Sequence, residues 1–252
     1  MLVDNKFIYI SLPRRGSTSF HYSCILHNLD IQTTNQTQGE NSKIDFNDID
    51  ETQIMNYIVH AHEPLVDLKK KFGVDYPIIS VKRDRHETFY SLYKHLIFDL
   101  KRVGAINVYE HFKNITLDEL FFFKTQDLLS NESRWRVIND YLLNKNLIKG
   151  KYNIPSKFNV PSEEYIINII NIFMTPSVFW HNNDPSIIWF DFNNFQELEN
   201  WVSEKINKPF KIKHVNSSKH IECGINLDYN FIEKYNSIYD YYDIAKNKKT
   251  LL

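Results

Sequence analysis

The most informative stretch of the chain begins with the apolar run FIYI (residues 7–10) and continues as SLPRRGSTSF (residues 11–20). This pattern predicts a buried strand that ends in a tight polar turn and leads into a helix. Such a turn directs backbone N–H groups, the positive end of a helix dipole, several hydroxyls and two guanidiniums toward one place. The stretch therefore predicts an anion-binding loop.

The residues of this loop that could bind an anion are basic, small or hydroxylated: Arg14, Arg15, Gly16, Ser17, Thr18 and Ser19. A Walker A loop is excluded, because that motif needs four residues between two glycines and a lysine before its Ser or Thr. The simplest alternative is a helix N-cap supplied by Ser17 or Thr18, with the two arginines in solvent. Two positive charges just before a helix N-terminus oppose the dipole, however, and this cost favours a bound anion.

Further along the chain, short apolar runs alternate with amphipathic helical patterns. Strands are predicted at 6–12, 57–61, 77–82 and 186–192, and helices at 19–29, 65–72, 87–103 and 195–206. This alternation is typical of an α/β protein with a central parallel β-sheet flanked by helices. Ligands of such sheets bind beyond the carboxyl ends of the strands, which is where the loop lies.

The middle region, residues 104–180, is irregular and mostly helical. Its best helix candidates are 117–124, 132–143 and 163–173, and a last helix is expected at 229–244. We expect residues 104–180 to be a helical insertion that shapes an acceptor pocket within a single domain spanning residues 1–252. Aromatic residues of this region, Trp135 and Trp180 among them, either stack on a substrate or fill a helical core.

Composition excludes several classes of function. A net charge of -1 gives no long-range attraction for nucleic acid or a membrane surface, so a local basic cluster must hold any anion. No apolar run is long enough to span a bilayer. The cysteines, Cys24 and Cys223, show no metal-ligand spacing, and we expect free buried thiols in a reducing compartment. We therefore expect a soluble cytoplasmic protein that binds neither nucleic acid nor membranes.

A second candidate phosphate site follows the strand predicted at 77–82. Arg83 stands at the end of this strand, and Ser91 follows eight residues later on the next helix. The two side chains could converge on one phosphate. Alternatively, Arg83 pairs with Asp84 or Glu87 at the surface and Ser91 is ordinary helix surface.

A third segment, HAHEP (residues 60–64), offers candidates for a general base. Its two histidines alternate, so they point to opposite faces if the segment is still a strand. A histidine near its ordinary pKa is the natural base at neutral pH, which makes His62 or His60 the candidate and Glu63 a weaker one. No further Cys, His or carboxylate follows at a ligand spacing, so no metal is expected.

Together, these segments resemble the sulfotransferases that use 3′-phosphoadenosine-5′-phosphosulfate (PAPS). The family's 5′-phosphosulfate loop reads Pro-Lys-x-Gly-Thr/Ser-Thr, and PRRGST (residues 13–18) is similar to it. The family's 3′-phosphate motif pairs a strand-end Arg with a Ser eight residues later, like Arg83 and Ser91. Cytosolic members carry Lys-Thr-His-x-Pro where this chain has HAHEP. Residues 187–206 and HVNSS (residues 214–218) resemble the family's late strand and helix and its C-terminal cofactor loop.

The resemblance implies in-line transfer of a sulfuryl group from PAPS to a hydroxyl or amine acceptor, a carbohydrate or another small molecule. It implies that His62 is the catalytic base and that Arg14, where many members have Lys, is also catalytic. It further implies that residues 14–19, Arg83, Ser91 and Lys219 bind the cofactor, with Lys219 replacing a basic triplet that this chain lacks. Either Arg14 or Arg15 would face the sulfonate.

Two other functions remain open at this point. One is a P-loop-like nucleotide kinase or phosphotransferase, which normally needs a P-loop lysine and an acidic ligand for Mg²⁺ at a strand end. The chain lacks that lysine, and the predicted strands carry His and Arg at their ends. The other is a module that binds an anion or nucleotide without catalysis.

Overall fold

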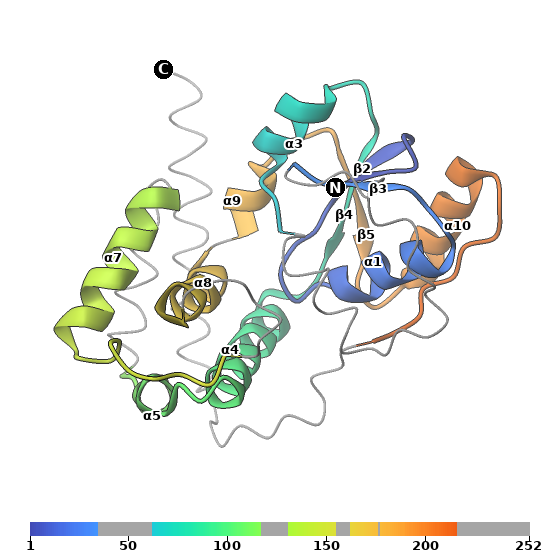
Figure 1. The fold of residues 1–252 in the computed structure, drawn as a ribbon. Coiled ribbons are helices and arrows are strands. Elements are labelled where there is room, and N and C mark those ends of the chain that lie inside the picture. The colour runs from blue at the N-terminus through green and yellow to red at the C-terminus, as the bar shows by residue number, and fades with distance from the viewer. Residues whose placement is uncertain (35–61, 117–130, 155–161, 176, 216–252) are drawn as a thin grey trace. The chain divides into compact units, whose positions relative to one another are not determined.

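The computed structural model describes residues 1–34, 62–116, 131–154, 162–175 and 177–215 (Figure 1). The expectations for the strand at 57–61, the helices at 117–124 and 229–244, and His60, Lys219 and Cys223 lie outside these residues. The chain divides into two compact units. We call Met1–Asp84 with Ser177–Ser217 the sheet unit, and the described residues of Arg85–Pro176 the helical unit.

The sheet unit contains a five-stranded mixed sheet with the strand order β3-β1-β2-β4-β5. The strands are β1 (Leu2–Val3), β2 (Phe7–Ile10), β3 (Ile31–Gln32), β4 (Ile78–Lys82) and β5 (Ile187–Asp191). The strands β2, β4 and β5 are parallel neighbours, with Ile8 opposite Ile78 and Ile78 opposite Ile187. The parallel arrangement expected from the sequence is confirmed for these three strands.

The expectation of a wholly parallel sheet is wrong, because β1 pairs antiparallel with both β2 and β3. A tight turn with Asp4 and Asn5 at φ 50° folds β1 back onto β2. Both β1 and β3 are two residues long, which is too short to produce a recognisable alternation of apolar and polar side chains.

Helices cover both faces of the sheet, which explains why all four residues of β2 are buried. Phe7 and Tyr9 join a core with α1 (Ser17–Leu26) and α10 (Phe195–Ile206). Ile8 and Ile10 join a second core with α3 (Leu65–Phe72) and the short α9 (Ser177–His181). Figure 1 shows these two helix pairs on opposite sides of the strands, so the sheet unit has three layers.

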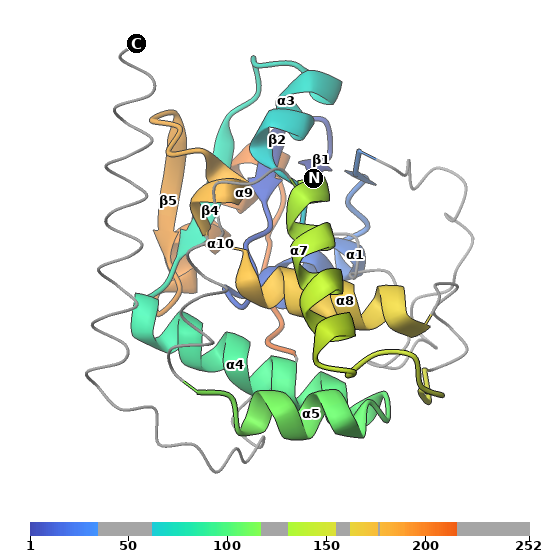
Figure 2. The same ribbon diagram turned by 90° about the vertical axis from the view of Figure 1, so that its left-hand side faces the viewer.

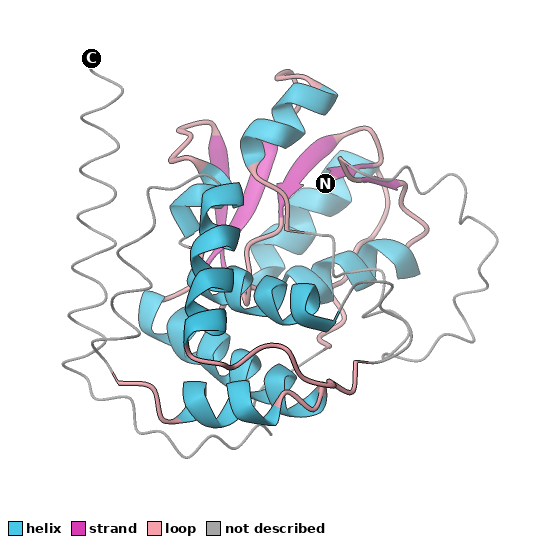
Figure 3. Cartoon of the chain, turned by 60° about the vertical axis from the view of Figure 1, so that its left-hand side comes forward, coloured by secondary structure: helices cyan, strands magenta, loops and turns pink. Residues whose placement is uncertain are grey.

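The helical unit is built from α4 (Arg85–Arg102), α5 (Ile106–Lys113), α7 (Asn131–Asn144) and α8 (Ser162–Met174). Its described residues include no strand (Figure 3). Helix α4 packs against α5 and α8, and α8 packs against α7 (Figure 2). The unit has a core of its own, which includes Phe89, Leu100, Phe112, Leu142 and Ile166. The helical unit begins at Arg85 and therefore includes α4. The helical insertion expected from the sequence, residues 104–180, does not include this helix.

The helix boundaries follow the sequence pattern closely. Helices α3 and α10 span the expected residues, and α7 and α8 extend the expected ranges by one residue at each end. The sequence pattern predicts neither α5 nor α9. Helices α1 and α4 begin two residues earlier than expected, α1 because the left-handed backbone at Gly16 starts the helix directly after it. In the described ranges, no helix combines the length and the apolar character needed to cross a bilayer.

Candidate anion-binding site

The loop between β2 and α1 lies at the carboxyl ends of the parallel strands, where ligands of α/β sheets bind. Its backbone is left-handed at Arg14, with φ 60°, and at Gly16, with φ 78°. A Cβ atom on Gly16 would lie 2.7 Å from Cζ of Phe195, the first residue of α10. Backbone conformation and lack of space therefore both require glycine at position 16.

Helix α1 begins without a side-chain cap. Its N-cap is Gly16, no side chain makes a capping hydrogen bond, and its first turn contains no acidic residue. The alternative in which Ser17 or Thr18 caps the helix is therefore wrong for this structure. No carboxylate of its own first turn neutralises the positive end of the dipole, which suits an external anion.

The N-cap interpretation expects the two arginines before α1 to lie in solvent. The structure shows otherwise. Arg15 is buried and Arg14 is half-buried. The neighbouring hydroxyl residues lie at similar depth, because Ser17 is buried and Thr18 is half-buried. The structure therefore places two cations and two hydroxyls around the beginning of α1, one of each buried and one of each half-buried.

The hydroxyl of Ser19 has a structural role in this arrangement. It donates to the carbonyl of Val215 at 3.1 Å and accepts from the amide of Val215 at 3.0 Å. One turn later, Ser23 Oγ accepts from the amide of Lys213 at 2.8 Å. These contacts hold the segment that follows α10 along α1.

Arg83 lies beside the loop. Its Nη1 donates to the carbonyl of Arg14 at 3.0 Å, and its guanidinium carbon is 4.3 Å from the ring centre of Phe192. The structure thus brings together the residues that follow β2, β4 and β5. Ser91 is buried on α4 in the helical unit, and its convergence with Arg83 on one phosphate stays a prediction.

His62 lies at the beginning of the same loop. Its Nδ1 is 2.7 Å from the carbonyl oxygen of Ser11, and its ring centre is 6.0 Å from that of Trp180. Because a carbonyl can only accept, Nδ1 donates, and the neutral ring then carries its lone pair on Nε2. His62 therefore has the tautomer that a general base at Nε2 requires.

Glu63, the weaker base candidate, is engaged elsewhere. It is buried, and its Oε1 accepts hydrogen bonds from both the amide and the hydroxyl of Thr34. These contacts connect the segment before α3 to the segment after β3. The Glu63 carboxylate therefore has a structural role as a hydrogen-bond acceptor.

Sequence reasoning did not single out two buried polar side chains of the sheet unit, Ser11 and His21. Within the described part of the chain, Ser11 Oγ, both ring nitrogens of His21 and Nε1 of Trp180 have no hydrogen-bond partner. Burial, with a smaller effect from the positive amino group of Met1, lowers the pKa of His21 to about 4. Buried polar groups usually bind protein, water or ligand, so these atoms favour a ligand or ordered water near the loop. No sequence motif marks them.

Comparisons of the chain with protein-family models, with curated proteins and with solved structures found no match. Among the described residues, no group of three or more His, Cys, Asp or Glu side chains could hold a metal ion.

Proposed function

We propose that this protein is a sulfotransferase that moves a sulfuryl group from PAPS to a hydroxyl or amine acceptor. The observation that carries the proposal is the 2.7 Å contact between His62 Nδ1 and the Ser11 carbonyl. An anion-binding loop alone fits many ligands. A histidine held beside that loop, with its basic nitrogen at Nε2, favours a reaction in which an acceptor must lose a proton.

The residues around the beginning of α1 fit the phosphosulfate end of such a donor. The helix N-terminus has neither a side-chain cap nor an acidic residue in its first turn, and Arg14 and Arg15 precede it. Ser17 and Thr18 add hydroxyl donors, whereas Ser19 is occupied by Val215. Arg83, and in our proposal Ser91 and Lys219, would bind the 3′-phosphate and the rest of the nucleotide.

The chemistry follows from these positions. His62 Nε2 would take the proton of the attacking hydroxyl or amine while the new bond to sulfur forms. The bond from sulfur to the bridging phosphate oxygen breaks in line, and its electron pair stays on that oxygen. The N-terminus of α1 and the guanidinium of Arg14 would stabilise the developing charge. Arg14 has no need to donate a proton, because the leaving phosphate is a weak base.

One feature favours testing a nucleotide kinase as the alternative. Asp191 ends β5, next to β4, and an acidic strand end is where kinases hold Mg²⁺. In this structure Asp191 Oδ1 accepts from the amide of Asn193 at 2.8 Å, which is an ordinary turn contact. The loop also lacks the lysine that kinases of this type use.

Ligand-dependent thermal stability distinguishes the two activities. Adenosine 3′,5′-bisphosphate (PAP), the product of the proposed reaction, should raise the melting temperature in the presence of EDTA. ATP with Mg²⁺ should give a smaller shift. A shift that requires Mg²⁺ and ATP, with none from PAP, would refute the sulfotransferase proposal.

The role of His62 is tested by replacing it with alanine. In a transfer assay with PAPS and a panel of hydroxyl and amine acceptors, we expect His62→Ala to lower turnover by about 10²–10⁴-fold. Binding of PAP should persist in this variant, because His62 does not contact the phosphates in our proposal. The control is His27→Ala at the other end of α1, which should keep full activity. Equal turnover in His62→Ala and wild type would exclude His62 as the base.

A further inference from the structure

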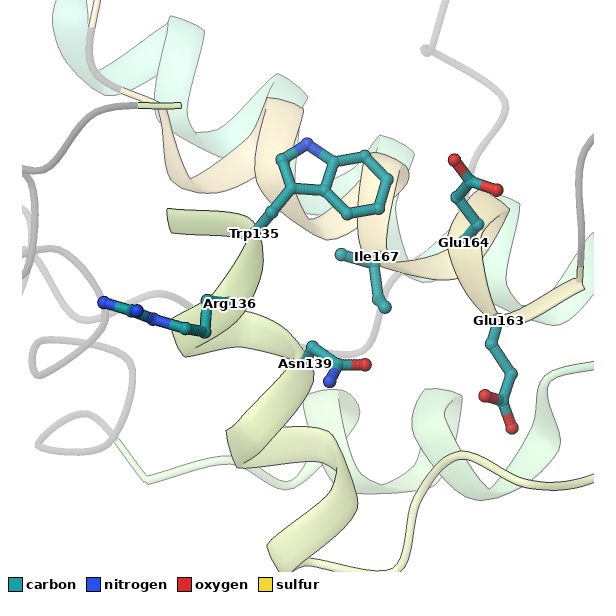
Figure 4. A pocket seen from close by; sticks show the side chains of 6 residues that line it. All are labelled: Trp135, Arg136, Asn139, Glu163, Glu164 and Ile167. Carbon is teal, nitrogen blue, oxygen red and sulfur yellow. The ribbon is translucent and has the colours of Figure 1, made fainter. Parts of the chain in front are cut away.

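A shallow cavity of about 470 Å³, largely open to solvent, lies between α7 and α8 in the helical unit (Figure 4). Its volume lies within the range of small-molecule binding pockets. The lining residues combine one aromatic ring, one aliphatic side chain and four polar side chains: Trp135, Arg136, Asn139, Glu163, Glu164 and Ile167. None of them belongs to the anion-binding site described above.

Helical spacing explains how these residues face the cavity. Trp135 and Asn139 are four residues apart on α7, and Glu163 and Ile167 are four residues apart on α8, so each pair shares a helix face. The half-buried indole of Trp135 packs against the core of the helical unit and lines the cavity as well. Ile167 is buried and lines the cavity from α8. The cavity thus has an apolar wall with a flat aromatic surface.

The polar side chains of the cavity are available to a ligand. Within the described residues, these four side chains (Arg136, Asn139, Glu163 and Glu164) make neither a hydrogen bond nor an ion pair. They offer two carboxylate acceptors, an amide that both donates and accepts, and a guanidinium donor. Hydrogen-bonding groups that line the same cavity as an aromatic ring fit a ligand with many hydroxyls and an apolar face.

The charges and directions of these groups decide between classes of ligand. Two carboxylates against one guanidinium disfavour a phosphate or another anion. The carboxylates of Glu163 and Glu164 point in different directions in Figure 4, so they do not converge on a single cation. Carboxylate and amide acceptors on the same two helices as the lining indole and Ile167 suit the hydroxyls of a sugar ring, whose C–H face can stack on the indole.

We propose that this cavity binds a saccharide, with Trp135 as the stacking surface and Asn139 and Glu164 as hydrogen-bonding partners. The inference stands on the helical unit alone and is independent of the sulfotransferase proposal. It assigns a binding function to this unit whatever reaction takes place in the sheet unit.

The test is ligand-observed NMR and calorimetry on the full chain with a panel of neutral trisaccharides built from glucose, galactose or N-acetylglucosamine. We expect at least one of them to bind and Trp135→Ala to weaken that binding at least tenfold. Asn139→Ala and Glu164→Gln should weaken it as well. The matched controls are Asp140→Asn, an exposed neighbour on α7 that does not line the cavity, and Trp201→Phe in the sheet unit. Both controls should bind like wild type.

Several outcomes would overturn the inference. They are the absence of saccharide binding at 20 mM (roughly the limit for a useful site), equal binding by wild type and Asn139→Ala, and binding of choline or spermidine in place of the sugars. Should Trp135→Ala fail to fold, Asn139→Ala and Glu164→Gln decide the question. Binding of PAP measured in the same samples reports separately on the sulfotransferase proposal.

Discussion

Gly16 is the residue on which the geometry of the loop most depends, because its backbone is left-handed and Phe195 fills the space where a side chain would start. We expect Gly16→Ala to lower the free energy of unfolding by about 2–3 kcal/mol, of which about 1 kcal/mol is backbone strain. The rest should come from the clash with Cζ of Phe195. Urea unfolding of the variant measures the total.

A double-mutant cycle separates the two contributions. Phe195→Leu removes the Cζ atom, so Gly16→Ala should cost only the backbone part in that background. If Gly16→Ala destabilises both backgrounds equally, the close approach to Phe195 does not restrict position 16.

His21 should make the protein sensitive to mild acid. Its folded-state pKa of about 4 lies below the ordinary value near 6.5, because the ring is buried. The unfolded chain therefore takes up a proton first as the pH falls, and stability present above pH 6.5 is lost between pH 6.5 and 4. The full effect is about 3 kcal/mol.

Unfolding titrations at several pH values check this expectation. His21→Gln should lose less stability than wild type between pH 6.5 and 4, and the two curves should run parallel above pH 7. The control is His27→Gln at the C-cap of α1, where the histidine is half-buried. Parallel curves for wild type and His21→Gln throughout the acid range would contradict the expected role of His21.

At the scale of residues, the sequence predicted side chains that belong to a pattern. Arg14, Gly16 and Arg83 follow predicted strands, and the structure places them in one neighbourhood. The Ser11 hydroxyl and the His21 ring have no hydrogen-bond partner in the described part of the chain. This could not be predicted, because burial depends on contacts between distant segments and leaves no local signal. The hydrogen bonds between the Ser19 hydroxyl and the backbone of Val215 could not be predicted for the same reason, since the two residues are 196 positions apart.

At the scale of elements, serine side chains connect the segment after α10 both to α1 and to α10 itself. Ser19 binds the amide of Val215, and Ser203 on α10 binds the amide of Phe210 at 2.9 Å. We expect Ser19→Ala to accelerate hydrogen exchange at Val215 about tenfold, the loss of roughly one hydrogen bond. Ser203→Ala should instead accelerate exchange at Phe210.

Each variant serves as the control of the other in this experiment. Faster exchange at both amides in either variant would show that the segment moves as one piece. Unchanged exchange at Val215 in Ser19→Ala would contradict the assigned contact.

The elements that the sequence predicted well are long enough to repeat their pattern. Helices α3 and α10 show a clear apolar face, and β4 is a run of buried residues that ends at the exposed Lys82, so local sequence defines their ends. The two-residue strands β1 and β3 have no such repeat. They form because the turn at Asp4 and Asn5 and the pairing with β2 hold them, which are tertiary effects.

At the scale of the whole molecule, the described residues form two units with separate hydrophobic cores. We therefore expect two separable unfolding events. In hydrogen exchange at low urea, the amides of β2 and β4 should share one free energy of opening. The amides of α4 and α8 should share a different one. Convergence of all these amides on a single value would show that the chain unfolds as one cooperative unit.

The boundary between these units was not visible in the sequence. The pattern indicated a helical insertion at 104–180, whereas the contacts of α4 place it with the helices that follow. A helix that directly follows a strand looks the same in sequence whether it covers the sheet or packs elsewhere. The residues that contact its apolar face determine whether it covers the sheet, and those residues are distant along the chain.

The left-handed backbone of Arg14 has a consequence for engineering the protein. An arginine at φ 60° is held at a cost of about 1 kcal/mol that glycine would avoid. Designers who seek a more heat-resistant variant would find position 14 attractive for that reason. In our proposal the same substitution removes the charge that faces the breaking bond. Position 14 is thus a place where resistance to heat and turnover trade against each other, and screens that select for thermostability alone should leave it unchanged.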